Sequence, residues 1–92
     1  MHGDLVDIDA NVSDTVTVRL YAAARSAAGE RELYVAPGRL DLILLDIARQ
    51  NPRLAQIFLQ CSFLLDGVVL HAKESVIPAG STVDVLPPFA GG

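Results

Sequence analysis

The stretch that decides the fold is Thr15–Gly29, which reads TVTVRLYAAARSAAG. Its first seven residues alternate between polar and apolar, which predicts an extended strand with one apolar side: Val16, Val18 and Leu20. The alanine-rich run Ala22–Ala28 then favours a short helix, because alanine is the best helix former, and Gly29 supplies a C-terminal stop. The domain is therefore expected to begin with a strand that passes directly into a helix.

The next stretch predicts a second strand and the main helix. The strand, Glu32–Val35, ends before Pro37-Gly38, and the helix follows over Leu40–Gln50 with Asp41 as a candidate N-cap. Apolar residues cover most of the circumference of this helix, which indicates burial on more than one side or an adhesive outer surface. Asn51-Pro52 ends it, and a shorter helix is expected over Pro52–Gln60.

The C-terminal third predicts a hairpin and a final strand. Ser62–Leu65 and Val68–Leu70 flank Asp66-Gly67, a dipeptide typical of two-residue hairpin turns with left-handed backbone. Residues 75–80 are expected to form a loop, and Ser81–Leu86 alternates again as the last strand. The order of elements predicts an α+β domain in which one sheet packs on one main helix, with short extra helices.

Charge and composition narrow the functional class. The formal net charge of −4 comes from the first fourteen residues, which hold four acids and no base, whereas later acids and bases balance. We expect residues 1–14 to be a mobile acidic leader. The sequence has no stripe of basic residues of the kind that binds nucleic acid. No apolar run is long enough to span a bilayer. One cysteine, Cys61, allows no internal disulfide, which fits a cytoplasmic protein.

The C-terminus, residues 87–92, reads PPFAGG and is expected to be an extended tail. Pro87-Pro88 forms a stiff spacer after the last strand, and the whole tail could reach roughly 20 Å at about 3.3–3.6 Å per residue. Gly91 and Gly92 lack a Cβ, so a narrow channel could close around them. A terminal carboxylate held in this way can attack the α-phosphate of ATP and form an acyl-adenylate. The tail therefore predicts a carrier loaded by other proteins.

The chain resembles the MoaD/ThiS family of ubiquitin-like β-grasp sulfur carriers over residues 15–92. The resemblance rests on Val18–Gly29, on the hairpin Leu64–Val69, and on Val83–Gly92 with its Pro-Pro-x-x-Gly-Gly end. The opening and the end are more similar to MoaD, the small subunit of molybdopterin synthase, than to ThiS. Two stretches depart from the family pattern, Leu40-Asp41 at the helix start and Ala79-Gly80-Ser81 before the last strand.

This resemblance implies a β-grasp domain over residues 15–86 with a mixed sheet, and a cycle centred on Gly92. A MoeB-like enzyme would adenylate Gly92 with ATP, and a sulfur donor would convert it to a thiocarboxylate. The tail would then enter a MoaE-like large subunit and give sulfur to cyclic pyranopterin monophosphate in molybdenum cofactor biosynthesis. The chain itself is expected to bind no cofactor or metal and to be no autonomous enzyme.

Strand parity adds a candidate docking surface. Thr17, Arg19 and Tyr21 point away from the helix if their apolar neighbours face it, and Asp84 and Leu86 do the same in the last strand. First and last strands are neighbours in a β-grasp sheet, so Tyr21 and Leu86 are expected to meet on its open face. Adding the tail and the MoaD pattern gives these partner-binding residues: Tyr21, Arg25, Val69, Leu86, Pro87, Pro88, Phe89 and Ala90.

Purely structural roles remain possible for several of these residues, and two other functions remain possible for the chain. Arg25 could pair with an acid of the activating enzyme or be an ordinary solvated arginine, while Cys61 fits a small core residue and His71 stands alone. A carrier or protein modifier in another pathway, such as cysteine or thiazole synthesis, would use the same activation chemistry. A non-carrier β-grasp binding module would need neither Gly91 nor Gly92.

Overall fold

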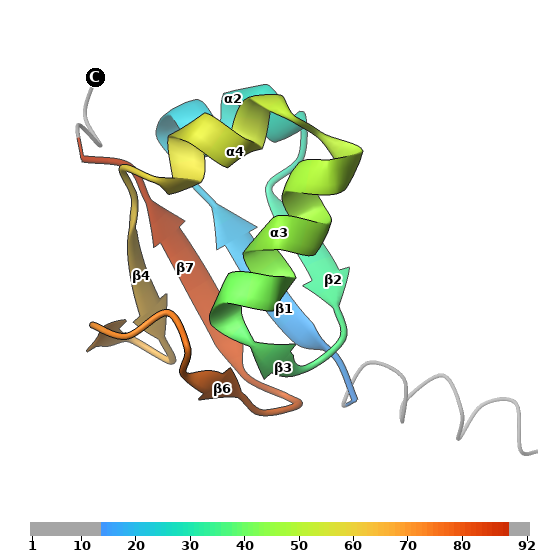
Figure 1. Cartoon of the computed structure of the whole chain (residues 1–92), viewed down its shortest axis with the longest axis vertical. Helices are drawn as coiled ribbons and strands as arrows, with labels where there is room; N and C mark the ends of the chain where they lie inside the picture. Colours follow the sequence, from blue (N-terminus) through green and yellow to red (C-terminus); the bar gives the residue numbers. More distant parts are fainter. Residues whose placement is uncertain (1–13, 89–92) are drawn as a thin grey trace, which may run out of the picture.

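The computed structural model describes residues 14–88, so most of the expected leader and residues 89–92 lie outside the described part. One five-stranded sheet organises the domain, in the order β2-β1-β7-β4-β5 (Figure 1). Its strands are β1 (Val16–Leu20), β2 (Glu32–Val35), β4 (Ser62–Leu65), β5 (Val68–Leu70) and β7 (Thr82–Leu86). The neighbours β1 and β7 are parallel and the other pairs are antiparallel, which confirms the predicted mixed sheet.

Three helices cover one face of this sheet: α2 (Ala22–Ala28), α3 (Leu40–Gln50) and α4 (Arg53–Phe58) (Figure 1). The predicted bounds of α2 and α3 are confirmed, and Gly29 ends α2 in the left-handed conformation with φ 75°. Asp66 and Gly67 also have positive φ, 48° and 86°, as the expected two-residue hairpin turn requires. Among residues 14–88, no helix is long and apolar enough to cross a membrane.

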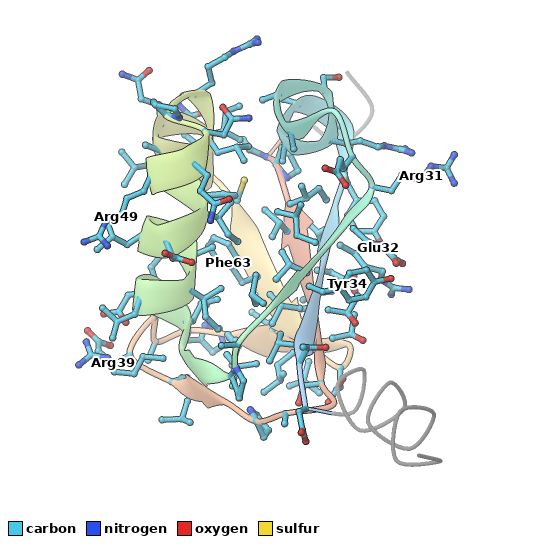
Figure 2. The ribbon with its side chains drawn as sticks, turned by 90° about the vertical axis from the view of Figure 1, so that its right-hand side faces the viewer. Arg31, Glu32, Tyr34, Arg39, Arg49 and Phe63 are labelled. Carbon is cyan, nitrogen blue, oxygen red and sulfur yellow. The ribbon has the colours of Figure 1, made fainter. Side chains whose placement is uncertain are left out.

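The core lies between the sheet and the helices. Each inward residue of the two central strands is almost completely buried: Val16, Val18, Leu20, Val83 and Val85. Leu40 and Leu54 close the core from the helical side, and Phe63 lies between α3 and the sheet (Figure 2). Full burial of such a side chain stabilises the fold by about 1.5–3 kcal/mol. The period-two pattern of β1 and β7 therefore exists because one of their faces is dry.

The start of α3 differs from the prediction that Asp41 caps it. Arg39 occupies the N-cap position with an extended backbone, and no side chain makes a capping hydrogen bond. Asp41 lies in the first turn, where its carboxylate accepts bonds of 3.1 and 2.6 Å from the Arg39 guanidinium. This guanidinium holds the pKa of Asp41 below its usual value. A carboxylate in the first turn also faces the positive end of the helix dipole.

A second, two-stranded sheet occupies a segment that was expected to be a loop. Strand β6 (Val76–Ile77) pairs antiparallel with β3 (Gly38–Arg39), just before α3. The Ile77 side chain is completely buried in the core, which holds this segment against the rest of the domain. Two-residue strands are too short to show the alternation from which a strand is predicted.

Candidate functional site

The candidate site is built around strand β7, because this strand carries the chain toward its C-terminus. β7 is a central strand: Val85 lies opposite Leu20 of β1 and also opposite Phe63 of β4. Pairing on both sides fixes the direction in which the chain leaves the sheet. Pro87 is buried and Pro88 is exposed directly after it. The predicted residues Phe89, Ala90, Gly91 and Gly92 lie outside the described part of the chain.

The face of the sheet opposite the helices, which we call the open face, carries a charged cluster at its centre. Arg19 lies opposite Asp84, and its Nε–H donates to Asp84 Oδ1 at 2.7 Å. The Tyr21 hydroxyl donates to the same oxygen at 3.3 Å. The hydrogen bond and the negative charge of Asp84 raise the pKa of Arg19. The Asp84 residue is only 9% exposed, so its carboxylate depends on these two donors.

This cluster changes the expected environment of Tyr21. Parity correctly places Tyr21 and Leu86 on the open face, and the structure directs the Tyr21 hydroxyl to Asp84, two residues before Leu86. Sequence reasoning did not single out Arg19 and Asp84. Their opposite charges at outward positions of the first and last strands were the available signal, but the pairing depends on a register set across 65 residues.

The other half of the open face is apolar. Leu64 lies opposite both Val69 and Asp84, and Leu86 lies opposite Ser62, so Leu64, Val69 and Leu86 share this side of β5, β4 and β7. Val69 is 50% exposed, while Leu64 and Leu86 are half-buried. No helix among residues 14–88 covers this face. An apolar surface next to a charged cluster is typical of a surface that binds another protein.

Arg25 lies on α2 beside the charged end of the open face. It lines a recess of about 170 Å³ together with Tyr21, the two further arginines Arg19 and Arg31, and one acid, Glu32. Within the described residues the Arg25 side chain forms no ion pair. Guanidinium groups bind carboxylates through paired hydrogen bonds, so this recess is suited to an acidic side chain of a partner.

The junction before Arg25 is strained. Ala22, the first residue of α2, has φ 50°, a left-handed conformation that costs an alanine about 1–2 kcal/mol. This sharp turn sends the chain from β1 into α2 immediately after Tyr21, while the Tyr21 backbone remains extended. The turn thus leaves Tyr21 on the open face and brings Arg25 close to it.

Among the described residues, Cys61 and His71 form no competing centre. The Cys61 thiol donates to the carbonyl of Ile57 at 3.1 Å, and partial burial raises its pKa, which disfavours the reactive thiolate. His71 is exposed after β5. Across residues 14–88, no group of three His, Cys, Asp or Glu side chains could hold a metal ion.

The fold is similar to those of several solved structures. Small archaeal modifier protein 1 from Methanosarcina acetivorans has a TM-score of 0.74 at 24% identity, over 85% of this chain and 96% of that one. A Pyrococcus furiosus protein named for molybdopterin converting factor subunit 1 has a TM-score of 0.72 at 18% identity, over 83% and 99%. One chain of the complex of molybdopterin-converting factor subunits 1 and 2 from Helicobacter pylori 26695 has 0.65 at 19%, over 85% and 99%.

These likenesses show that the chain has the ubiquitin-like β-grasp fold of MoaD-type proteins, as the family resemblance of the sequence implies. No protein-family model matches the sequence, and no curated protein sequence matches it significantly. At the identities found, the shared property is the fold, and the functional argument rests on the residues of this chain.

Proposed function

We propose that this chain is a sulfur carrier and the small subunit of a molybdopterin synthase, with Gly92 as its reactive residue. The observation that carries the proposal is the position of β7. A central strand, paired on both sides, ends in Pro87-Pro88 beside the apolar half of the open face, and the sequence then ends in Gly-Gly. Docking through the open face would place the C-terminus in the partner's active site.

The proposed chemistry takes place in two steps on partner proteins. The Gly92 carboxylate attacks the α-phosphate of ATP, a P–O bond forms and pyrophosphate leaves. A cysteine persulfide of the activating proteins then attacks the acyl carbon with its outer sulfur, and AMP leaves. A second thiol of those proteins attacks the inner sulfur of the resulting acyl disulfide, so that the S–S bond breaks, a protein disulfide forms and the thiocarboxylate leaves. The chain supplies the carboxylate and the docking surface, while the catalytic acids and bases belong to the partners.

Two kinds of partner are proposed to bind this site in turn. A MoaE-like large subunit would receive the tail and use the thiocarboxylate sulfur on cyclic pyranopterin monophosphate. The Helicobacter pylori complex supports this partner, because a chain of the same fold there binds a second subunit. A MoeB-like adenylating enzyme would bind the same surface in turn, and the Arg25 recess is suited to its acidic side chains.

A second candidate function is favoured by one comparison. Small archaeal modifier protein 1 shares the fold over most of this chain, and its name describes a protein modifier. A modifier would use the same adenylated Gly92 but transfer the acyl group to an amine. A carrier for cysteine or thiazole synthesis would again share the first step.

The test uses the full chain and a matched chain that lacks only Gly92. With a MoeB-like enzyme, the full chain should support ATP–pyrophosphate exchange and the truncated chain should not. The thiocarboxylate form, mixed with a MoaE-like subunit and cyclic pyranopterin monophosphate, should yield molybdopterin. Exchange without molybdopterin formation by any large subunit would favour the modifier or another pathway, and exchange by the truncated chain would contradict all carrier functions.

A further inference from the structure

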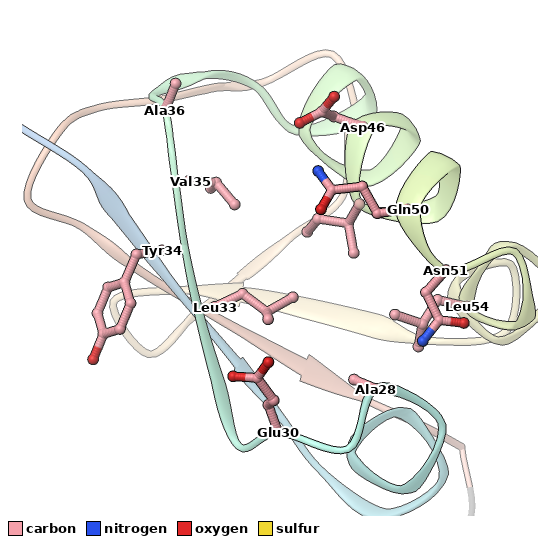
Figure 3. Close-up of a pocket in the computed structure, with 11 residues that line it drawn as sticks. Ala28, Glu30, Leu33, Tyr34, Val35, Ala36, Asp46, Gln50, Asn51 and Leu54 are labelled. Carbon is pink, nitrogen blue, oxygen red and sulfur yellow. The ribbon is translucent and has the colours of Figure 1, made fainter.

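A groove runs between the edge strand β2 and helix α3, away from the open face and from β7. Its volume is about 460 Å³, within the range of pockets that accept ligands or side chains (Figure 3). Leu33 and Val35 of β2 line one wall, and Asp46 and Gln50 of α3 line the other. Leu54 of α4 is buried at one end of the groove.

The strand wall of this groove has unused backbone groups. β2 is an edge strand, paired only with β1 among the described residues. The Leu20 N–H donates to the Arg31 carbonyl at 2.8 Å, so the backbone groups of Leu33 and Val35 also face β1 by alternation. Those of Glu32 and Tyr34 therefore face outward along the free edge. Exposed strand edges of this kind bind further extended segments through backbone hydrogen bonds.

The side chains around the edge favour a particular kind of segment. The Tyr34 side chain points to the other side of β2 and leaves the groove open (Figure 3). Aliphatic side chains, among them those of Leu33, Val35 and Leu54, share the lining with polar ones. The acids Glu30 and Asp46 have no ion-pair partner among residues 14–88. No lysine or arginine lines the groove. An occupant with alternate aliphatic side chains and flanking basic residues complements both features.

We propose that this groove, which we call the β2–α3 groove, binds an extended segment of a partner protein by strand addition at β2. The segment would place alternate aliphatic side chains between β2 and α3, and its basic residues beside Glu30 and Asp46. The N-terminal residues of this chain are a poor occupant, because residues 1–14 hold four acids and no base and would be repelled by Glu30 and Asp46. This site lies away from β7 and from the open face, so the chain would carry a second interaction surface.

The probe is the synthetic peptide acetyl-Lys-Thr-Ile-Thr-Val-Thr-Lys-amide, in which the lysines and the aliphatic residues share one side of an extended strand. It is titrated to about 1 mM into the full ¹⁵N-labelled chain. Amide shift changes should be confined to β2, its flanking residues and the facing side of α3. Removal of Gly92 should leave the peptide affinity unchanged. No binding at this concentration, or shifts confined to the open face or to the α3–α4 surface, would overturn the proposal.

Backbone pairing and charge are tested separately. In an added strand, alternate amides face β2. N-methylating the first two threonines or, instead, the isoleucine and the valine should therefore give opposite results. One pair should weaken binding at least about ten-fold and the other should not, since each buried hydrogen bond contributes about 0.5–1.5 kcal/mol. Equal effects of the two pairs would contradict strand addition.

The double variant Glu30→Gln/Asp46→Asn should weaken peptide binding about five-fold, because two exposed ion pairs contribute about 1 kcal/mol in all. Glu74→Gln, which removes an exposed acid outside the groove, is the matched control and should change nothing. A chain without residues 1–13 should bind the peptide as the full chain does. Tighter binding after this deletion would show that the N-terminal residues occupy the groove. If sedimentation detects a dimer and the peptide dissociates it, a second copy of the chain occupies the groove instead.

Discussion

The two faces of the sheet use the same strands for different purposes. Along β7, Val83 and Val85 are fully buried beneath the helices, while Asp84 and Leu86 alternate with them on the open face. The inner face is packed mainly with aliphatic and aromatic side chains, whereas the open face combines an ion pair with an apolar surface. The core that stabilises the fold and the proposed docking surface therefore lie on opposite sides of the same strands. Substitutions at neighbouring positions should separate their effects.

The largest expected effect is on the inner face. Leu20→Ala should lower the free energy of unfolding by about 2–5 kcal/mol, because Leu20 is 2% exposed and its truncation leaves a cavity. Leu59→Ala, the same substitution at a residue that is 76% exposed, should change it by less than about 0.5 kcal/mol. Urea unfolding measures both. Similar losses of unfolding free energy in the two variants would contradict the assignment of Leu20 to a buried inner face.

The next effect is on partner binding. Val68 and Val69 are adjacent exposed residues of β5 that point to opposite sides of the sheet. Val69→Asp should weaken binding of a MoaE-like subunit at least about ten-fold, since a charge is introduced into an apolar contact surface. Val68→Asp introduces the same charge outside the open face and should have little effect. Calorimetric titration compares them, and equal weakening would show that docking does not depend on the open face.

A smaller effect is expected where the chain turns from β1 into α2. Ala22→Gly should stabilise the protein by up to about 1 kcal/mol, because glycine adopts positive φ without steric cost. Ala23→Gly, one residue later in ordinary helix, should destabilise it by about 0.5–1 kcal/mol. Thermal unfolding distinguishes opposite signs, and a loss of stability in both variants would contradict the strained turn that leaves Tyr21 on the open face.

The smallest effect concerns the ion pair on the open face. Asp84→Leu should lower the melting temperature, because Arg19 and the Tyr21 hydroxyl lose their shared acceptor. The double variant Arg19→Leu/Asp84→Leu should recover part of the loss, since apolar side chains can replace an ion pair. A double variant less stable than Asp84→Leu alone would show that Arg19 stabilises the sheet by other contacts.

Most elements could be predicted from local sequence because their signals are local. The alternation of β1 and β7, the alanines of α2 and the Asp66-Gly67 turn each lie within a few residues, and the structure confirms them. The cap of α3 could not be assigned in this way, because the helix begins before Asp41 and its first amides donate to distant carbonyls. The Leu40 and Asp41 N–H groups donate to the carbonyls of Ser75 and Lys73 at 2.9 and 2.8 Å. Strands β3 and β6 are too short for any pattern and form only by pairing across the chain.

The part of the candidate site that depends on local sequence patterns was predictable, and the part that depends on strand register was not. Parity along β1 and β7 places Tyr21, Leu86 and their neighbours on one face, but it does not give the register that joins Arg19 to Asp84. The β2–α3 groove has no local signal at all, because its walls come from elements that are separated in sequence and meet only after folding. Gly91 and Gly92 are visible in the sequence, and their role stays a proposal.

The central claim is that Gly92 is loaded with sulfur, and intact-mass measurement tests it most directly. The full chain, incubated with a MoeB-like enzyme, ATP and a sulfur donor, should gain about 16 Da as sulfur replaces one carboxylate oxygen. The gain should map to the C-terminal peptide and be absent from the chain without Gly92. An unchanged mass with activating enzymes that load another carrier, or a gain elsewhere in the chain, would contradict the account.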